Sequence, residues 1–271
     1  MPERMNPIPI GPKSAVLLAL LSVAGLVMFA WPLFAPAPAD AGQHTTDAPW
    51  LFVALLPLLV LLVAVQLTEG GIDAKALAML GVLSAVNAIV RPLGAGTNGV
   101  ETVFFLLIAA GRVFGPGFGF VLGCTSMFAS ALLTAGVGPW LPFQMIVAAW
   151  IGMGAGLLPG RRLRKAPELA LLVVFGIIAA YLFGALMNLW FWPFVAGDSG
   201  DAALAYIPGG PIGENLKRFA VYTLVTSTAL WDTGRAITTT VLTLVLGPSV
   251  LAVLRRASRR AAFDPVVEFV P

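Results

Sequence analysis

Residues 111–159, GRVFGPGFGFVLGCTSMFASALLTAGVGPWLPFQMIVAAWIGMGAGLLP, contain two apolar runs that are each about long enough to cross a bilayer. The Gly/Pro-rich turn GVGPWLPF (136–143) joins the runs, and the basic cluster RRLRK (161–165) follows the second. No Asp, Glu, Lys or Arg lies between Arg112 and Arg161. Small residues recur along both runs, and in lipid they let helix backbones approach closely. The stretch therefore predicts an antiparallel pair of membrane helices joined by a structured turn.

Composition places the whole chain in the same class. Of its 271 residues, 59% are hydrophobic and 11% are charged, whereas soluble domains carry about 25% charged residues. The formal net charge of +3 does not indicate nucleic-acid binding, because the basic residues cluster beside apolar runs. The single cysteine, Cys124, lies inside an apolar run, which argues against a disulfide framework or a thiolate metal site. We expect an all-α integral membrane protein.

A bilayer core needs about 20 apolar residues per helix, and eight segments approach this length. The predicted spans are residues 14–34, 50–68, 74–91, 99–113, 117–135, 140–158, 169–194 and 235–254. Residues 212–231 are left over, amphipathic and polar at their start, so they form either an outer lid or a ninth span.

The distribution of Lys and Arg predicts the orientation of these spans, because short cytoplasmic loops carry the excess of basic residues. With eight spans, every strong basic group falls on one side together with both termini, which are therefore expected to be cytoplasmic. These groups are Arg4, Lys13, Lys75, Arg112 and the clusters at 161–165 and 255–260. The loops 35–49 and 195–211 hold acids without Lys or Arg and fall outside, whereas Lys217 and Arg218 are the exception.

The pattern divides the chain into three parts. Residues 1–70 form a two-helix leader that ends near the linker TEGGID (68–73), and residues 71–260 form a six-helix unit. Residues 261–271 form a short cytoplasmic tail. No internal repeat argues for a carrier built from two inverted halves.

Catalytic motifs do not stand out. The only histidine, His44, lies in a predicted outer loop, and no DDxxD, HExxH, GxSxG or phosphate-loop pattern occurs. We therefore expect neither enzymatic activity nor ATP hydrolysis by the chain itself. An integral-membrane enzyme, a stand-alone secondary carrier and a purely structural membrane protein remain the alternatives.

Polar and aromatic side chains gather at the predicted outer ends of the six core spans, where the topology brings distant residues together. Such residues at membrane depth are candidate functional groups. Each group also has a structural interpretation, since the tryptophans could form an interfacial belt and Asp232–Arg235 or Glu101–Arg91 could simply pair. The candidate set is Asn98, Glu101, Trp140, Phe143, Gln144, Asn188, Trp192, Trp231, Asp232 and Arg235.

A stripe of small residues follows one face of the span 74–91. It comprises Ala74, Ala78, Gly81, Ala85 and Ala88. A stripe of this kind permits tight helix packing. It serves either packing within the six-helix unit or docking of another membrane subunit.

Residues 71–260 resemble the substrate-binding membrane subunit, or S component, of energy-coupling factor (ECF) vitamin transporters. The resemblance rests on AKALAMLGVLSAVNAIVRPL (74–93), GRVFGPGFGFVLG (111–123), GVGPWLPFQMIVAAWIGMGAG (136–156) and WDTGRAITTTVLTLVLGPSVLAVLRRASRR (231–260). The two-helix leader departs from the six-span pattern of the family.

The resemblance implies a multi-pass subunit of a prokaryotic plasma membrane that captures a vitamin from outside and needs no cofactor. Its implied partners are a transmembrane coupling subunit and two cytoplasmic ATPases, whose ATP hydrolysis drives toppling of the subunit. The implied cap comprises Asn98 to Glu101, Trp140 to Gln144 and the segment that begins at Tyr206 and ends at Asp232. Ala74 and Ala78, with Gly81 on the same face, would dock on the coupling subunit.

The abundance of Trp and Phe and the wide loop 195–215 suit a large, ring-bearing ligand. Cobalamin or a related corrinoid is the first candidate, and riboflavin or another ring-bearing vitamin is the second. A carrier of metal ions that uses histidine ligands is disfavoured, because His44 lies outside the six-helix unit.

Overall fold

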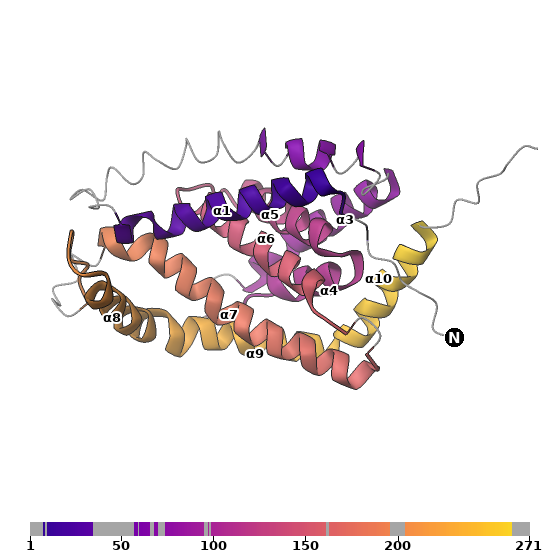
Figure 1. The fold of residues 1–271 in the computed structure, drawn as a ribbon. Coiled ribbons are helices and arrows are strands. Elements are labelled where there is room, and N and C mark those ends of the chain that lie inside the picture. The colour runs from indigo at the N-terminus through magenta and orange to yellow at the C-terminus, as the bar shows by residue number, and fades with distance from the viewer. Residues whose placement is uncertain are drawn as a thin grey trace, which may run out of the picture.

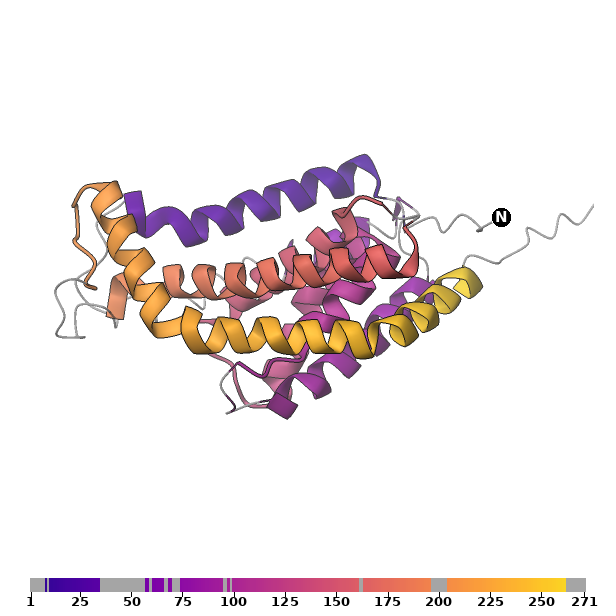
Figure 2. The same ribbon diagram turned by 90° about the horizontal axis from the view of Figure 1, so that it is seen from below.

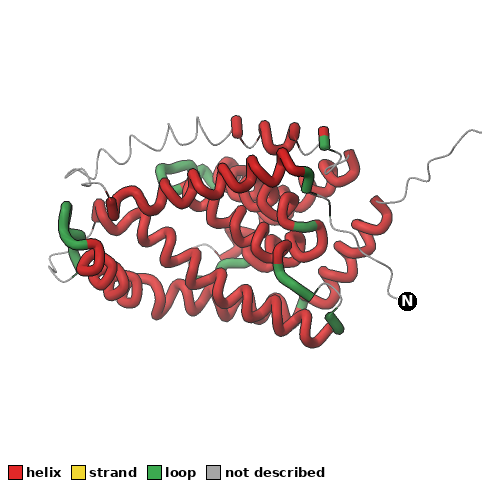
Figure 3. The backbone as a smooth tube through the Cα atoms, in the orientation of Figure 1, coloured by secondary structure: helices red, strands yellow, loops and turns green. Residues whose placement is uncertain are grey.

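A computed structural model describes residues 8, 10–34, 57–58, 60–65, 68–69, 74–94, 97, 99–160, 163–195 and 204–261. Within these ranges every regular element is a helix, which confirms the all-α prediction (Figure 3). The elements are α1 (Pro12–Phe34), α3 (Ala74–Val90), η1 (Arg91–Gly94), α4 (Val103–Phe114), α5 (Pro116–Leu133), α6 (Leu141–Leu157), α7 (Lys165–Val195), α8 (Ile212–Thr223), η3 (Leu224–Asp232), α9 (Thr233–Val245) and α10 (Gly247–Ala261).

Several of these helices can cross a membrane. Among the described residues, α1, α3 with η1, α5 and α7 are long and apolar enough to span, and the helix Ile212–Val245 with α10 is a fifth candidate, a bent pair. The helices α4 and α6 are apolar but shorter. About half of the predicted span 50–68 lies outside the described residues, so the count of eight spans and the position of the termini stay predictions.

The last predicted span, 235–254, has the wrong boundaries. One continuous helix runs from Ile212 to Val245 through α8, η3 and α9, and α10 leaves it at an angle of 66°. Pro248 causes the break, because proline lacks a backbone N–H and its ring clashes with the carbonyl four residues earlier. Residues 212–231 are therefore the first half of a long helix rather than a separate lid.

The stretch 111–159 forms the centre of the bundle. The helices α4, α5 and α6 cross at glycines, so closely that a methyl group added to Gly111 or Gly119 would meet the Gly152 carbonyl. One on Gly123 would meet the α6 backbone at Ala148 and Ala149. Backbone contact of this kind is how small residues hold membrane helices together, and the predicted antiparallel pair is confirmed.

The leader helix α1 packs directly on this bundle (Figure 1). Phe29 is 1% exposed, with its ring centroid 5.1 Å from that of Phe143 and 6.0 Å from that of Trp150. Trp150 Nε1 donates a hydrogen bond of 3.2 Å to Ser22 Oγ on α1. The described part of the leader therefore shares its core with α4–α7.

The two ends of the bundle differ, as two perpendicular views show (Figures 1 and 2). The α10 end holds the starts of α1 and α7, and the α8 end holds α8 and the end of α7. At the α10 end, Glu69 accepts hydrogen bonds from the backbone N–H groups of Lys13 and Ser14 and from the Ser14 hydroxyl. The hydroxyl bond is the main cause of a pKa of Glu69 below its usual value, and the contact anchors the start of α1.

Candidate functional site

The connection between η1 and α4 is a tight turn seated against the long C-terminal helix. Thr97 Oγ1 donates a hydrogen bond of 2.6 Å to the Gly94 carbonyl. Gly99 has a φ of 74°, a left-handed conformation that favours glycine, and a methyl group there would meet the Trp231 carbonyl. This close approach fixes the position of Glu101, two residues further along.

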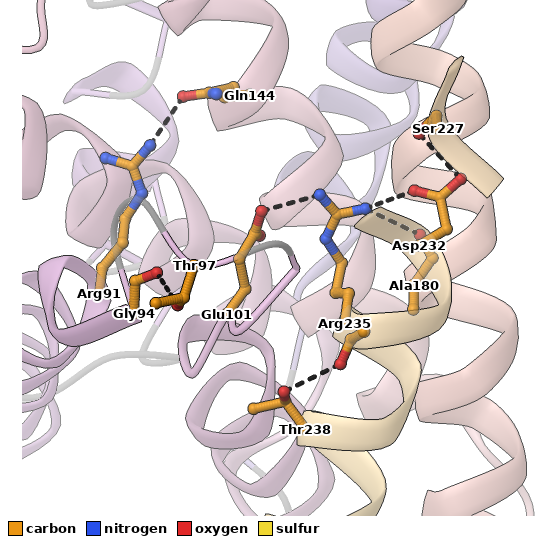
Figure 4. A network of polar contacts seen from close by, with 11 residues as sticks. Arg91, Gly94, Thr97, Glu101, Gln144, Ala180, Ser227, Asp232, Arg235 and Thr238 are labelled. Atoms are coloured by element: carbon orange, nitrogen blue, oxygen red, sulfur yellow. Dashed lines mark hydrogen bonds and ion pairs between the residues drawn. The ribbon is translucent and has the colours of Figure 1, made fainter. Parts of the chain in front are cut away.

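Arg235 on α9 connects this turn with α7 (Figure 4). Its Nη2 lies 2.8 Å from Glu101 Oε1 and its Nη1 lies 2.7 Å from Asp232 Oδ1. Nη1 also donates a hydrogen bond of 3.4 Å to the Ala180 carbonyl on α7. The guanidinium carbon lies 4.8 Å from the centroid of the Phe183 ring. Arg235 and Asp232 are buried, so this ion pair is shielded from solvent.

The π-helical segment η3 shapes the acidic side of this network. Ser227 Oγ donates a hydrogen bond of 3.0 Å to Asp232 Oδ2, five residues away. Thr233 Oγ1 donates a bond of 2.7 Å to the Thr228 carbonyl and shares a hydrogen bond of 3.0 Å with the hydroxyl of Tyr181 on α7. Segments of π-helix occur frequently at functional sites because they reposition side chains within a helix.

A second polar contact lies on the other side of Glu101. Arg91 Nη2 donates a hydrogen bond of 3.1 Å to Gln144 Oε1, at the start of α6, and Nη1 lies 3.4 Å from Ser130 Oγ on α5. The Glu101 carboxylate also lies within electrostatic range of Arg91 (Figure 4). Arg91 and Arg235 thus lie on either side of one carboxylate, with groups from η1, the turn before α4, α5, α6 and α9.

Two aromatic groups lie further along α7, toward the α8 end. The Trp190 ring centroid is 5.0 Å from that of Phe143. Trp192 is fully buried, donates a hydrogen bond of 2.7 Å to the Leu204 carbonyl, and lies 5.3 Å from the ring centroid of Tyr206. Burial raises the pKa of Tyr206. Because Trp190 and Trp192 are buried, they do not form an interfacial belt.

The predicted site residues therefore fall into separate groups. Glu101, Asp232 and Arg235 form one network, and Gln144 joins Arg91 beside it. Phe143 belongs to the aromatic core, whereas Trp192 and Tyr206 form a cluster of their own. The remaining members are Asn188, whose buried Nδ2 has no hydrogen-bond partner among the described residues, the exposed Trp140 and Trp231, and Asn98, which lies outside the described residues.

Sequence reasoning missed part of this arrangement. Glu101 makes its ion pair with Arg235 rather than with Arg91. Arg91 and Ser227 were not in the predicted set. Arg91 could have been included, because a charged residue at the end of an apolar span can be identified from the sequence. Ser227 has no such signal, because its contact with Asp232 depends on the π-helical segment.

The small-residue stripe of α3 faces outward over most of its length. Ala74, Ala78, Gly81 and Ala85 are exposed, and only Ala88 is buried. A methyl group added to Gly81 would meet no atom within 4 Å. Packing within the described bundle therefore does not account for these four residues.

The described residues contain no group of His, Cys, Asp and Glu side chains that could hold a metal ion. A family model described as "ECF transporter, substrate-specific component" matches residues 75–251. No curated protein and no solved structure matches the chain.

Proposed function

Because the chain belongs to the substrate-specific components of ECF transporters, we propose that it captures a ring-bearing vitamin, with cobalamin or a related corrinoid as the first candidate. Riboflavin or a similar vitamin is the second. Members of this family are transporter subunits rather than enzymes, and they are multi-pass membrane proteins.

The observation that carries this proposal is the convergence of Arg91, Gln144, Glu101 and Arg235 from separate elements. Charged groups at membrane depth are costly and mark functional sites. The aromatic rings of Phe104 and Phe183 lie beside Arg235, so charged and apolar groups occur together, as is typical of small-molecule sites. The Nδ2 of Asn188, which has no hydrogen-bond partner within the described part of the chain, supplies a further donor for a ligand.

In the proposed mechanism the subunit binds the vitamin at the charged network around Arg235 and at the neighbouring residues toward the α8 end. It then docks on a membrane coupling subunit through the α3 stripe. Two ATPase subunits hydrolyse ATP, and the resulting toppling turns the ligand toward the cytoplasm. The exposed Ala74, Ala78 and Gly81 support this docking assignment, because they leave an uncovered surface for close helix contact.

Vitamin binding to the purified full-length protein tests the proposal. We expect Gln144→Ala to weaken binding of the vitamin by about 5- to 150-fold, since a partly buried polar partner that loses its hydrogen bond costs about 1–3 kcal/mol. Thr68→Ala, an exposed residue outside the six-helix unit, serves as the control. Thermal unfolding of each variant separates loss of the site from loss of the fold.

Absence of binding for every corrinoid and flavin would contradict the ligand proposal, and equal affinity of Gln144→Ala and the native protein would contradict the site. Uptake by the chain alone in vesicles, without coupling or ATPase subunits, would favour a stand-alone secondary carrier. A product released from a lipid substrate would favour an integral-membrane enzyme.

A further inference from the structure

The sharp bend at Gly247 places a basic amphipathic helix at the α10 end of the bundle. Leu251 and Leu254 of α10 are buried against the bundle, whereas Arg256 and Arg259 are exposed. An amphipathic helix that follows a membrane span and carries arginines is suited to lie in the membrane interface. The predicted cytoplasmic side is also the side where anionic lipids attract basic residues.

A pocket of about 250 Å³ lies between α10 and the start of α7. Leu169, Pro248, Leu251 and Ala252 provide its apolar lining, and the charged lining consists of Lys165, Glu168, Arg255, Arg256 and Arg259. Its volume is below the roughly 300–1,000 Å³ of sites that enclose drug-sized ligands. The pocket, called here the basic pocket, therefore suits a small anionic group with an apolar attachment.

The one carboxylate that lines the basic pocket is already neutralised. Glu168 is 2% exposed, Arg112 Nε lies 3.0 Å from its Oε1, and Arg255 Nη2 lies 2.6 Å from each of its oxygens. Within the described part of the chain, Lys165, Arg256 and Arg259 have no ion-pair partner, and the buried Arg255 Nε has no hydrogen-bond partner. The pocket thus has an excess of positive charge and an unused donor.

We propose that the basic pocket binds a phosphoryl anion, with the headgroup of an anionic membrane phospholipid as the source that the geometry favours. Arginine and lysine bind phosphate through charge-assisted hydrogen bonds. The apolar lining accommodates the glycerol and the first acyl carbons of a lipid, which free phosphate lacks. The site lies at the end opposite α8, so it is separate from the vitamin site and does not depend on that proposal (Figure 1).

The test uses the full chain in nanodiscs of phosphatidylcholine with and without phosphatidylglycerol, and native mass spectrometry counts the retained lipid. The variant Arg256→Gln/Arg259→Gln removes two cations and leaves the Arg255–Glu168 contact intact. The matched control Lys217→Gln/Arg218→Gln removes two cations at the α8 end. Each basic side chain near an anionic surface contributes a factor of about five, so we expect roughly 25-fold weaker retention of phosphatidylglycerol in the first variant only.

A second arm adds inorganic phosphate to the protein in neutral detergent. Retention of phosphatidylglycerol that phosphate does not displace supports the lipid headgroup, whereas displacement by phosphate at low concentration supports a site for soluble phosphoryl compounds. Equal retention in the native protein and the Arg256/Arg259 variant, with both folded as judged by thermal unfolding, would overturn the proposal. Binding of an acidic peptide through the same arginines, without binding of lipid or phosphate, would also overturn it and indicate a protein partner.

Discussion

Two buried arginines show how differently this fold uses the same side chain. Arg112 donates from Nη1 and Nη2 to the Leu158, Pro159 and Gly160 carbonyls and from Nε to Glu168. Arg235 pairs with Asp232 and with Glu101, which is partly exposed, and its Nε has no hydrogen-bond partner among the described residues. Arg112 is therefore a structural anchor of α6, whereas Arg235 retains capacity for a further partner.

Arg112→Met should lower the free energy of unfolding by about 3–5 kcal/mol. The change leaves Glu168 with one cationic partner and removes the donors that satisfy three carbonyls after α6, and breaking a buried ion pair costs this much. Denaturant unfolding in detergent micelles measures the effect. The control is Arg218→Met, which disrupts an exposed pair with Glu214 and should change stability by less than about 1 kcal/mol. Equal effects of the two changes would refute the anchor role.

At this scale the sequence predicted local contacts better than distant ones. The i,i+3 spacing of Asp232 and Arg235 allowed an ion pair as one of two alternatives, and the structure contains that pair. Glu101 pairs with Arg235 and not with Arg91, the alternative that the sequence left open. Its position depends on how the turn at Gly99 packs against the carbonyl of Trp231. Residues more than a hundred positions apart meet there, and no periodicity in the sequence encodes that contact.

Among the elements, α4, α5 and α6 depend on glycines whose backbones touch. A methyl group on Gly152 would meet the backbone carbonyl of Gly119, which cannot move without separating α5 from α6. Glycine at this crossing therefore has a packing role, in contrast to Gly81 on the open face of α3.

The matched substitutions Gly152→Ala and Gly81→Ala isolate this effect. We expect Gly152→Ala to destabilise the protein by about 3 kcal/mol or more, because overpacking against a rigid backbone is costly. Gly81→Ala should be neutral or stabilising by up to about 1 kcal/mol, since alanine favours the helix and meets no neighbour. Thermal unfolding of both variants in the same detergent is the measurement, and a stable Gly152→Ala protein would contradict the close-packing account.

The sequence predicted helix boundaries correctly where apolar residues are continuous. The prediction failed where polar residues occur within a long helix. The predicted spans 74–91 and 117–135 agree closely with α3 and α5. Lys217 and Arg218 made the start of the long C-terminal helix resemble a surface segment, although no proline interrupts the sequence from Ile212 to Val245. The breaking signal, Gly247 followed by Pro248, was present in the sequence within the predicted span 235–254.

For the molecule as a whole, the difference in length between α4 and α7 determines how far the polar groups lie from each end of the bundle. At about 1.5 Å per residue, α4 is roughly 18 Å long and α7 roughly 46 Å. The turn before α4 therefore lies well short of the end of α7, and Figure 1 shows α7 and α8 continuing beyond the short helices. The charged network of Glu101 and Arg235 lies at the turn before α4, whereas Arg112, Glu168 and Arg255 lie at the α10 end.

In the proposed function, the exposed face of α3 docks on the membrane coupling subunit. Ala74→Leu/Ala78→Leu should leave vitamin binding unchanged, because both side chains point away from the described bundle, but it should reduce uptake at least tenfold in cells that carry the coupling and ATPase subunits. Loss of one close helix contact of about 1.4 kcal/mol already corresponds to a tenfold change. Ala15→Leu/Ala19→Leu, which enlarges two exposed alanines at the same spacing on α1, controls for added bulk. Co-purification with the coupling subunit should fall in parallel with uptake, since both depend on the same surface. Normal uptake with normal co-purification in the α3 variant would show that docking uses another face, even if the vitamin site is correct.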